Sequence, residues 1–134
     1  MHIAALIGRT LLASIFAASG IVKLVSSEDV RDVLIAHYLP VSPGLATALV
    51  IGSALVELLG AFLLILGFRT RWAVGLLVAA LIPATFLYHF SMGEENQVVH
   101  LLKNVSILGG LLLVWASGPG DLSVDARRSG ARAP

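Results

Sequence analysis

The chain contains no cysteine and few charged residues. None of its 134 residues is a cysteine, which excludes disulfides, thiolate metal sites and thiol–disulfide chemistry performed by this chain alone. Any redox role therefore requires a bound cofactor or a partner protein. Charged residues make up only 13% of the chain, about half the share of a typical soluble domain. The net charge of +1 offers no basis for a nucleic-acid partner.

Long apolar segments dominate the sequence instead. Hydrophobic residues make up 57% of the chain, which is typical of a membrane protein. A helix that crosses a bilayer needs about 20 mostly apolar residues, and four segments qualify: about 4–25, 46–67, 72–90 and 98–116. The sequence therefore predicts an all-α membrane protein in which residues 1–117 form a bundle of four transmembrane helices.

The first apolar segment is predicted to span the membrane rather than to act as a signal peptide. Arg9 interrupts the apolar run, and no cluster of positive charge precedes it, whereas signal peptides have the opposite arrangement. The small residues between Phe16 and Gly20 suit close packing between helices.

Arginines in the loops predict the orientation in the membrane. Two lie in the short loop at residues 68–71 and three in the tail at residues 118–134, so the positive-inside rule makes both segments cytoplasmic. The loops at residues 26–45 and 91–97 carry mainly acids. We therefore expect both termini in the cytoplasm, a disordered cytoplasmic tail, and a multi-pass protein of the inner (cytoplasmic) membrane of a bacterium.

The first outer loop contains a helix signal of its own. Serines and acids at residues 26–29 suit a helix start, and Val30, Val33 and Leu34 recur at helical spacing. We expect a short amphipathic helix on the outer surface, over Glu28–Tyr38. A plain connector with one helical turn is the alternative.

Several ionisable side chains fall inside the predicted spans. A charge in the hydrocarbon region costs about 2.5 to 3.5 kcal/mol on insertion scales, so such residues face the bundle interior, pair with each other or serve a function. With a rise of about 1.5 Å per residue, Glu57 lies near the bilayer centre. The other candidate site residues lie in the outer half: Tyr88, His89, His100, Lys103 and Asn104.

Each of these positions also has a structural interpretation. Arg9 lies within reach of Glu57, so a structural Arg9–Glu57 pair is the main alternative to a functional carboxylate. Lys23 is interpreted as an anchor whose ammonium snorkels to the outer surface. His100, near a helix start, is equally well explained as solvated. His89 is either a group that exchanges protons near neutral pH or a hydrogen-bonded interface residue.

Several segments of the chain resemble the DoxX family of small four-helix membrane proteins. The similar segments are Gly8–Leu12 with Phe16–Leu24, Glu57–Gly60 with Leu66–Arg71, Ala84–Phe90, and His100–Val105 with Leu108–Leu112. No segment is specific alone, but their order and spacing are. The family resembles the membrane subunit of a thiosulfate:quinone oxidoreductase, and its members have been linked to membrane-associated oxidative-stress complexes.

The resemblance implies a redox-associated, quinone-interacting membrane subunit. His89, Lys103 and Tyr88 would donate hydrogen bonds or protons to a quinone carbonyl, Asn104 would orient the ring, and Glu57 would pass protons. His89 and His100 could face each other, but a metal site lacks a clear third ligand, so we expect none. Electrons would come from a protein partner.

Two other classes of function stay open. The first is a non-catalytic scaffold or assembly protein, in which the charges pair inside a full core and the outer helix is a docking surface. The second is a small-molecule or lipid permease with a water-filled path through Glu57, although four helices enclose little room. Tight packing within or between protomers, including a homo-oligomer, is suggested by Gly52, Gly60, Gly75, Gly109 and Gly110.

Overall fold

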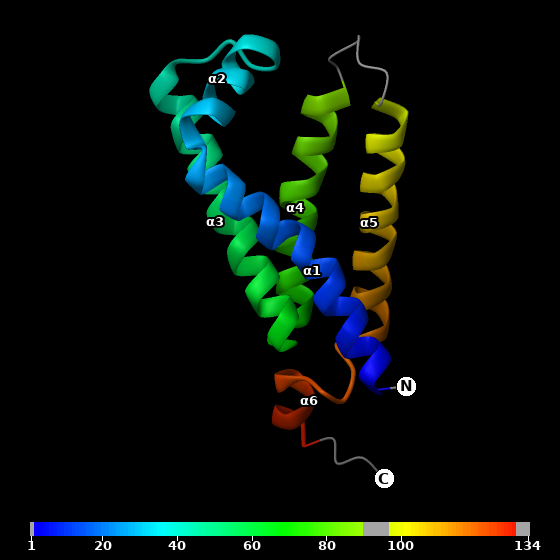
Figure 1. Ribbon diagram of the computed structural model, residues 1–134. Helices are drawn as coiled ribbons and strands as arrows, with labels where there is room; N and C mark the ends of the chain where they lie inside the picture. The colour runs from blue at the N-terminus through cyan, green and yellow to red at the C-terminus, as the bar shows by residue number, and fades with distance from the viewer. Residues whose placement is uncertain (1, 90–96, 131–134) are drawn as a thin grey trace.

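A computed structural model describes residues 2–89 and 97–130, which form helices and no strands. The helices are α1 (His2–Val25), α2 (Ser27–His37), α3 (Pro43–Leu66), α4 (Thr70–His89), α5 (Gln97–Ser117) and α6 (Val124–Arg128). The prediction of an all-α protein is confirmed. The N-terminus and the C-terminal segment lie at the same end of the bundle, which we call the terminal end, and α2 lies at the opposite end (Figure 1).

Four of the helices are long and apolar enough to cross a membrane, as predicted. The third helix begins three residues before the predicted span because Pro43 occupies its first turn, where the missing N–H of proline costs nothing. It ends at Gly67, whose φ of 62° is a left-handed conformation that glycine adopts readily. Large apolar side chains such as Leu113 (70% exposed) cover the outer surface of the bundle, as a lipid-facing surface requires.

The predicted amphipathic helix is present as α2. It starts one residue earlier than expected, and Glu28 and Asp29 lie in its first turn, where acids interact favourably with the helix dipole. None of its residues is fully buried. The helix lies across α3 at the end of the bundle opposite the terminal end and connects α3 to α1 (Figure 1).

The first and third helices form the tightest pair in the bundle. Gly20 makes this approach possible, because a Cβ atom there would lie 2.7 Å from Leu58 Cγ and 3.0 Å from the Ala54 carbonyl oxygen. By contrast, α5 packs mainly on α4 and meets α1 at the terminal end, where Gly110 faces Leu12. Figure 1 shows α1 running diagonally away from α5 towards α2. The two helices therefore diverge in the half of the bundle that contains α2.

Residues 118–130 fold against the terminal end of the bundle, which differs from the predicted disordered tail. Gly118 and Gly120 both have a φ of 80° and turn the chain out of α5. The short helix α6 follows, and the Ser123 hydroxyl caps it by accepting a hydrogen bond of 3.1 Å from Ala126 N. The polar, small-residue composition suggested disorder, but this segment is tied down by two contacts with distant residues.

The first contact joins Asp125 to the start of α4. Its carboxylate accepts hydrogen bonds from Arg69 N (2.8 Å), Thr70 N (2.9 Å) and Thr70 Oγ1 (2.8 Å), so a residue of the tail caps this helix. Asp125 N donates to the Gly67 carbonyl oxygen at 2.9 Å. Burial raises the pKa of Asp125, but the hydrogen bonds from Thr70 and Arg69 and the charge of Arg128 outweigh burial, so its pKa lies below the ordinary value.

Candidate functional site

Arg9 also holds residues 118–130 against the bundle, and it does not form the expected pair with Glu57. The Arg9 side chain is buried, with 3% of the residue exposed. Its guanidinium donates to the carbonyl oxygen of Pro119 at 2.6 Å and to that of Leu122. The structure thus uses Arg9 to hold the tail and does not bring it to Glu57.

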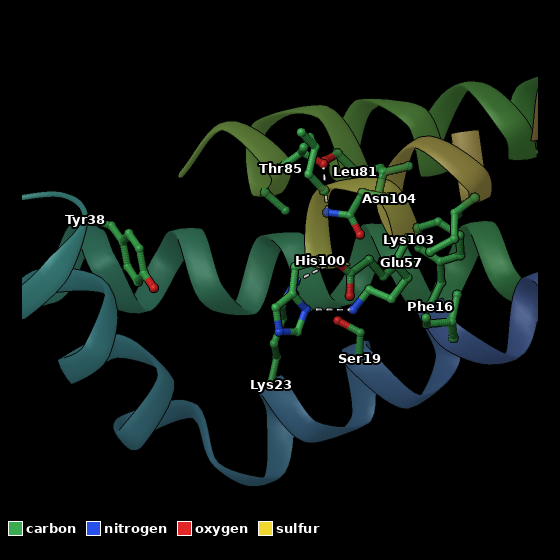
Figure 2. Close-up of a pocket in the computed structure, with 14 residues that line it drawn as sticks. Phe16, Ser19, Lys23, Tyr38, Glu57, Leu81, Thr85, His100, Lys103 and Asn104 are labelled. Atoms are coloured by element: carbon green, nitrogen blue, oxygen red, sulfur yellow. Dashed lines mark hydrogen bonds and ion pairs between the residues drawn. The ribbon is translucent and has the colours of Figure 1, made fainter. Parts of the chain in front are cut away.

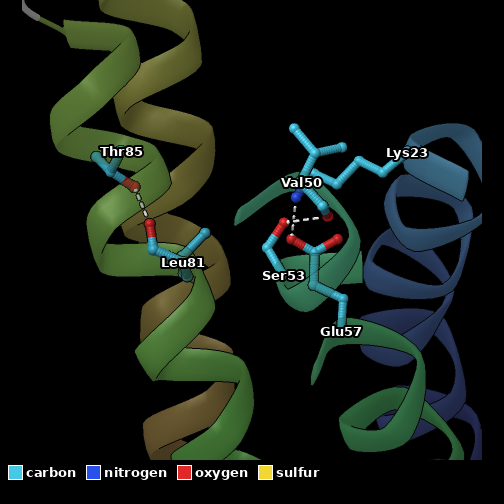
Figure 3. Close-up of polar contacts among 6 residues, drawn as sticks. All are labelled: Lys23, Val50, Ser53, Glu57, Leu81 and Thr85. Carbon is cyan, nitrogen blue, oxygen red and sulfur yellow. Dashed lines mark hydrogen bonds and ion pairs between the residues drawn. The ribbon is translucent and has the colours of Figure 1, made fainter. Parts of the chain in front are cut away.

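Glu57 pairs with Lys23 instead. Lys23 Nζ lies 2.5 Å from Glu57 Oε1, and the two side chains are 18% and 5% exposed. Figure 3 shows the lysine reaching from α1 to the carboxylate on α3. Sequence position alone does not set the register between α1 and α3. Because Gly20 packs beside Ala54, α3 extends past the end of α1, and Lys23 lies close to Glu57.

One oxygen of this carboxylate is left without a partner. Glu57 Oε2 is buried and accepts no hydrogen bond among the residues that the structure describes. The nearby Ser53 hydroxyl donates to the Val50 carbonyl oxygen at 2.9 Å within its own helix (Figure 3). A buried carboxylate oxygen without a donor is costly, so this position is suited to holding a proton.

The pair lies in the wall of a cavity of about 450 Å³ between α1, α3, α4 and α5. Its floor is apolar and includes Phe16, Leu81 and Ile107. The polar side chains that line it are shown in Figure 2: Ser19, Lys23, Tyr38, Glu57, Thr85, His100, Lys103 and Asn104. This cavity lies where α1 and α5 diverge.

The cavity contains four of the predicted site residues: Glu57, His100, Lys103 and Asn104. The side chains of the other two, Tyr88 and His89, lie outside the described residues. Sequence reasoning did not assign four further lining residues to the site: Ser19, Lys23, Tyr38 and Thr85. Two of them had a usable signal, because Lys23 is a charge in a span and Thr85 shares a helix face with His89.

Hydrogen bonds orient the side chains that α5 contributes. Lys103 Nζ lies 3.4 Å from His100 Nδ1, one helical turn earlier. Asn104 Nδ2 donates to Thr85 Oγ1 at 3.0 Å, and that hydroxyl donates to the Leu81 carbonyl oxygen at 2.7 Å. The hydrogen bond from Asn104 to Thr85 ties α5 to α4. It leaves Asn104 one further amide N–H to donate.

The two lysines that line the cavity differ in whether a carboxylate neutralises them. Lys23 is neutralised by Glu57, whereas Lys103 contacts only the His100 ring among the described residues. The site therefore combines an ammonium, an amide and an imidazole on one side with a half-satisfied carboxylate on the other. This arrangement favours a ligand that accepts hydrogen bonds at one edge and exchanges a proton at another.

Metal ligands do not gather in the described part of the chain. Within it, no three side chains of histidine, cysteine, aspartate or glutamate are close enough together to hold a metal ion.

Comparison with known proteins agrees with this architecture. The inner membrane protein YqjF of Escherichia coli (strain K12) is 29% identical over 120 residues, which cover 90% of this chain and 88% of the relative. No solved structure matches the chain. With its four apolar helices, the chain is a multi-pass protein of the inner membrane. The DoxX family matches residues 4–90, and the chain belongs to this family.

Proposed function

We propose that the chain is the quinone-binding membrane subunit of a redox complex and that the cavity holds the quinone ring. The observation that carries the proposal is the cavity itself, in which Lys103 and Asn104 lie opposite the half-satisfied carboxylate of Glu57. Its volume of about 450 Å³ falls within the usual range for small-ligand sites, about 300 to 1,000 Å³.

The residues of the lining fit a quinone ring. A quinone has a flat apolar ring with a carbonyl acceptor at each of two edges. When bound, it would accept two electrons and two protons. Phe16 and Ile107 offer apolar contact to such a ring. Lys103 and Asn104 supply donors for a carbonyl oxygen.

We assign proton exchange at the site to the Glu57 carboxylate. Glu57 Oε2 has no hydrogen-bond partner among the described residues and is available to hold a proton. Lys103 Nζ lies 3.4 Å from His100 Nδ1, so the ammonium and the imidazole act together beside the ring. The electrons come from a partner protein, since the chain has no cysteine for thiol–disulfide chemistry of its own.

Two observations weigh against the other functions. A scaffold would match each buried charge inside a full core, yet Glu57 Oε2 has no partner among the described residues and Glu57 lines a cavity. A permease would continue the path to the terminal end, where Ala13, Leu64 and Leu111 are fully buried in a packed core. The scaffold is the second candidate, because the Lys23–Glu57 pair joins two helices without any ligand.

Quinone binding by the purified protein tests the proposal. We expect stoichiometric quinone to co-purify in mild detergent and to be identified by mass spectrometry. Lys103→Ala should weaken binding by roughly tenfold or more, because a hydrogen bond from a charged donor contributes about 1.5 to 3 kcal/mol. Leu113→Ala on the same helix is the control, since that side chain is 70% exposed and does not line the cavity.

The opposite result would change the assignment. If the folded wild-type protein neither co-purifies with quinone nor binds added quinone, the quinone function is wrong. If Lys103→Ala fails to fold and the wild-type protein binds no quinone, the charges are structural. The scaffold function is then favoured over the quinone function.

A further inference from the structure

A second cavity adjoins the proposed quinone site. It has a volume of about 690 Å³ and lies between α2, α3 and α4. We call it the apolar groove. Its lining is almost entirely aliphatic, with Leu34 and Leu39 on the α2 side, Val56 on α3 and Leu87 on α4.

The polar groups of the apolar groove are already engaged. Ser53 donates its hydroxyl to the Val50 carbonyl oxygen, and the Lys23 ammonium is bound to Glu57. Tyr38 also has a polar or ring partner. The groove therefore selects an occupant by shape and apolar contact, and not by hydrogen bonds.

The walls of the apolar groove include small residues. Gly52 on α3 and Ala79 and Ala80 on α4 line the groove, and these small residues lie among the larger aliphatic side chains of its walls. A Cβ atom at Gly52 would meet no atom within 4 Å. The groove therefore has room for a side chain at position 52.

The apolar groove and the quinone cavity share part of their walls. Lys23, Tyr38 and Ala84 line both. Figure 2 shows Tyr38 set apart from the donors on α5, on the far side of the quinone cavity. A molecule with its ring between Lys103 and Glu57 therefore reaches the groove past Tyr38.

We propose that the substrate is a quinone with a long apolar tail and that this tail lies in the apolar groove. The inference rests on the proposed function and adds the position and chemistry of the second half of the ligand. A tail that leaves lipid for the groove gains little from the hydrophobic effect, because lipid is equally apolar. Its contribution comes from packing, so filling the groove should displace it.

Two probes and two variants test this inference. The probes are a quinone with a ten-carbon alkyl tail and the same ring carrying a methyl group in its place. Gly52→Leu fills the groove. Gly75→Leu is the control, since a Cβ atom there also meets nothing within 4 Å and Gly75 lines neither cavity. Binding is measured in detergent, and thermal unfolding checks that both variants fold.

The tailed quinone should bind Gly52→Leu roughly tenfold more weakly than wild type, a typical effect of a steric change in an apolar pocket. The methyl quinone should bind both proteins equally, and Gly75→Leu should bind both probes like wild type. If Gly52→Leu binds the tailed quinone as wild type does, or loses both probes equally, the tail does not lie in the groove. If neither probe binds wild type, the quinone function itself fails and this inference with it.

Discussion

Lys23 Nζ and Glu57 Oε1 lie 2.5 Å apart and join α1 to α3 inside the membrane span. The lysine is partly exposed and the carboxylate is almost fully buried. The pair therefore links the two helices and leaves the second carboxylate oxygen, Glu57 Oε2, buried without a hydrogen-bond partner among the described residues.

Removing the cation from this pair should destabilise the protein. Lys23→Met leaves the Glu57 carboxylate buried without its partner, which lowers the free energy of unfolding by about 3 kcal/mol. The double variant Lys23→Met/Glu57→Leu should recover most of this loss, because it also removes the buried charge. Chemical unfolding in detergent measures both. A double variant no more stable than Lys23→Met would show that the helices depend on the ion pair itself.

The tail should detach when Arg9 is replaced. Arg9→Met removes the donors to the carbonyl oxygens of Pro119 and Leu122, so residues 118–130 should be released from the bundle. Trypsin should then cleave after Arg127 and Arg128 several times faster than in wild type, because proteolysis follows local opening. Thr10→Ala is the control, since that exposed hydroxyl bonds only within its own helix. Equal cleavage rates in all three proteins would contradict the role of Arg9 as the anchor.

Acid should release the same segment through Asp125. Its pKa is lowered in the folded protein from an ordinary value of 3.8, so its stabilising effect is fully present above that value. The effect is lost as the pH falls below 3.8 and through the lower pKa of the folded state.

A spin label detects this release. The chain has no native cysteine, so Ser129→Cys supplies a single labelling site at an exposed position. The label should be immobile at neutral pH and become mobile below the ordinary pKa of the carboxyl. Asp125→Asn should be mobile already at neutral pH, because an amide cannot accept all three hydrogen bonds. An acid transition that persists in Asp125→Asn would assign the release to another group.

The contact between α1 and α3 should tolerate no side chain at Gly20. A Cβ atom there lies 2.7 Å from Leu58 Cγ, so Gly20→Ala should lower the free energy of unfolding by about 1 to 3 kcal/mol. Gly8→Ala on the same helix meets no atom within 4 Å and should leave stability unchanged or slightly higher, because alanine favours the helix. Comparable losses in both variants, measured by thermal unfolding, would show that the close approach is not limiting.

The four spans and the outer helix were predictable because they depend on local properties of the chain. Apolar length determines the spans. Short signals such as Pro43, Gly67 and the acids at the start of α2 set the ends of helices within a few residues. Four of the six site candidates also line one cavity, because polar side chains in a span must face the bundle interior.

The partners of the charges depended on tertiary structure. Arg9 contacts a residue 110 positions away, and Asp125 caps a helix that begins 55 positions earlier, so composition alone suggested a disordered tail. Likewise, the pairing of Glu57 with Lys23 follows from the register that Gly20 permits between α1 and α3.

Sequence by itself determined that this is a four-span membrane protein of the DoxX family, because span length, loop boundaries and motif order are properties of the chain. Tertiary structure alone decided which charges pair, where the tail docks and where the two cavities open. These features depend on helix tilt and register, and both arise from close contacts such as Gly20 with Ala54 and Leu58 between segments far apart in the sequence.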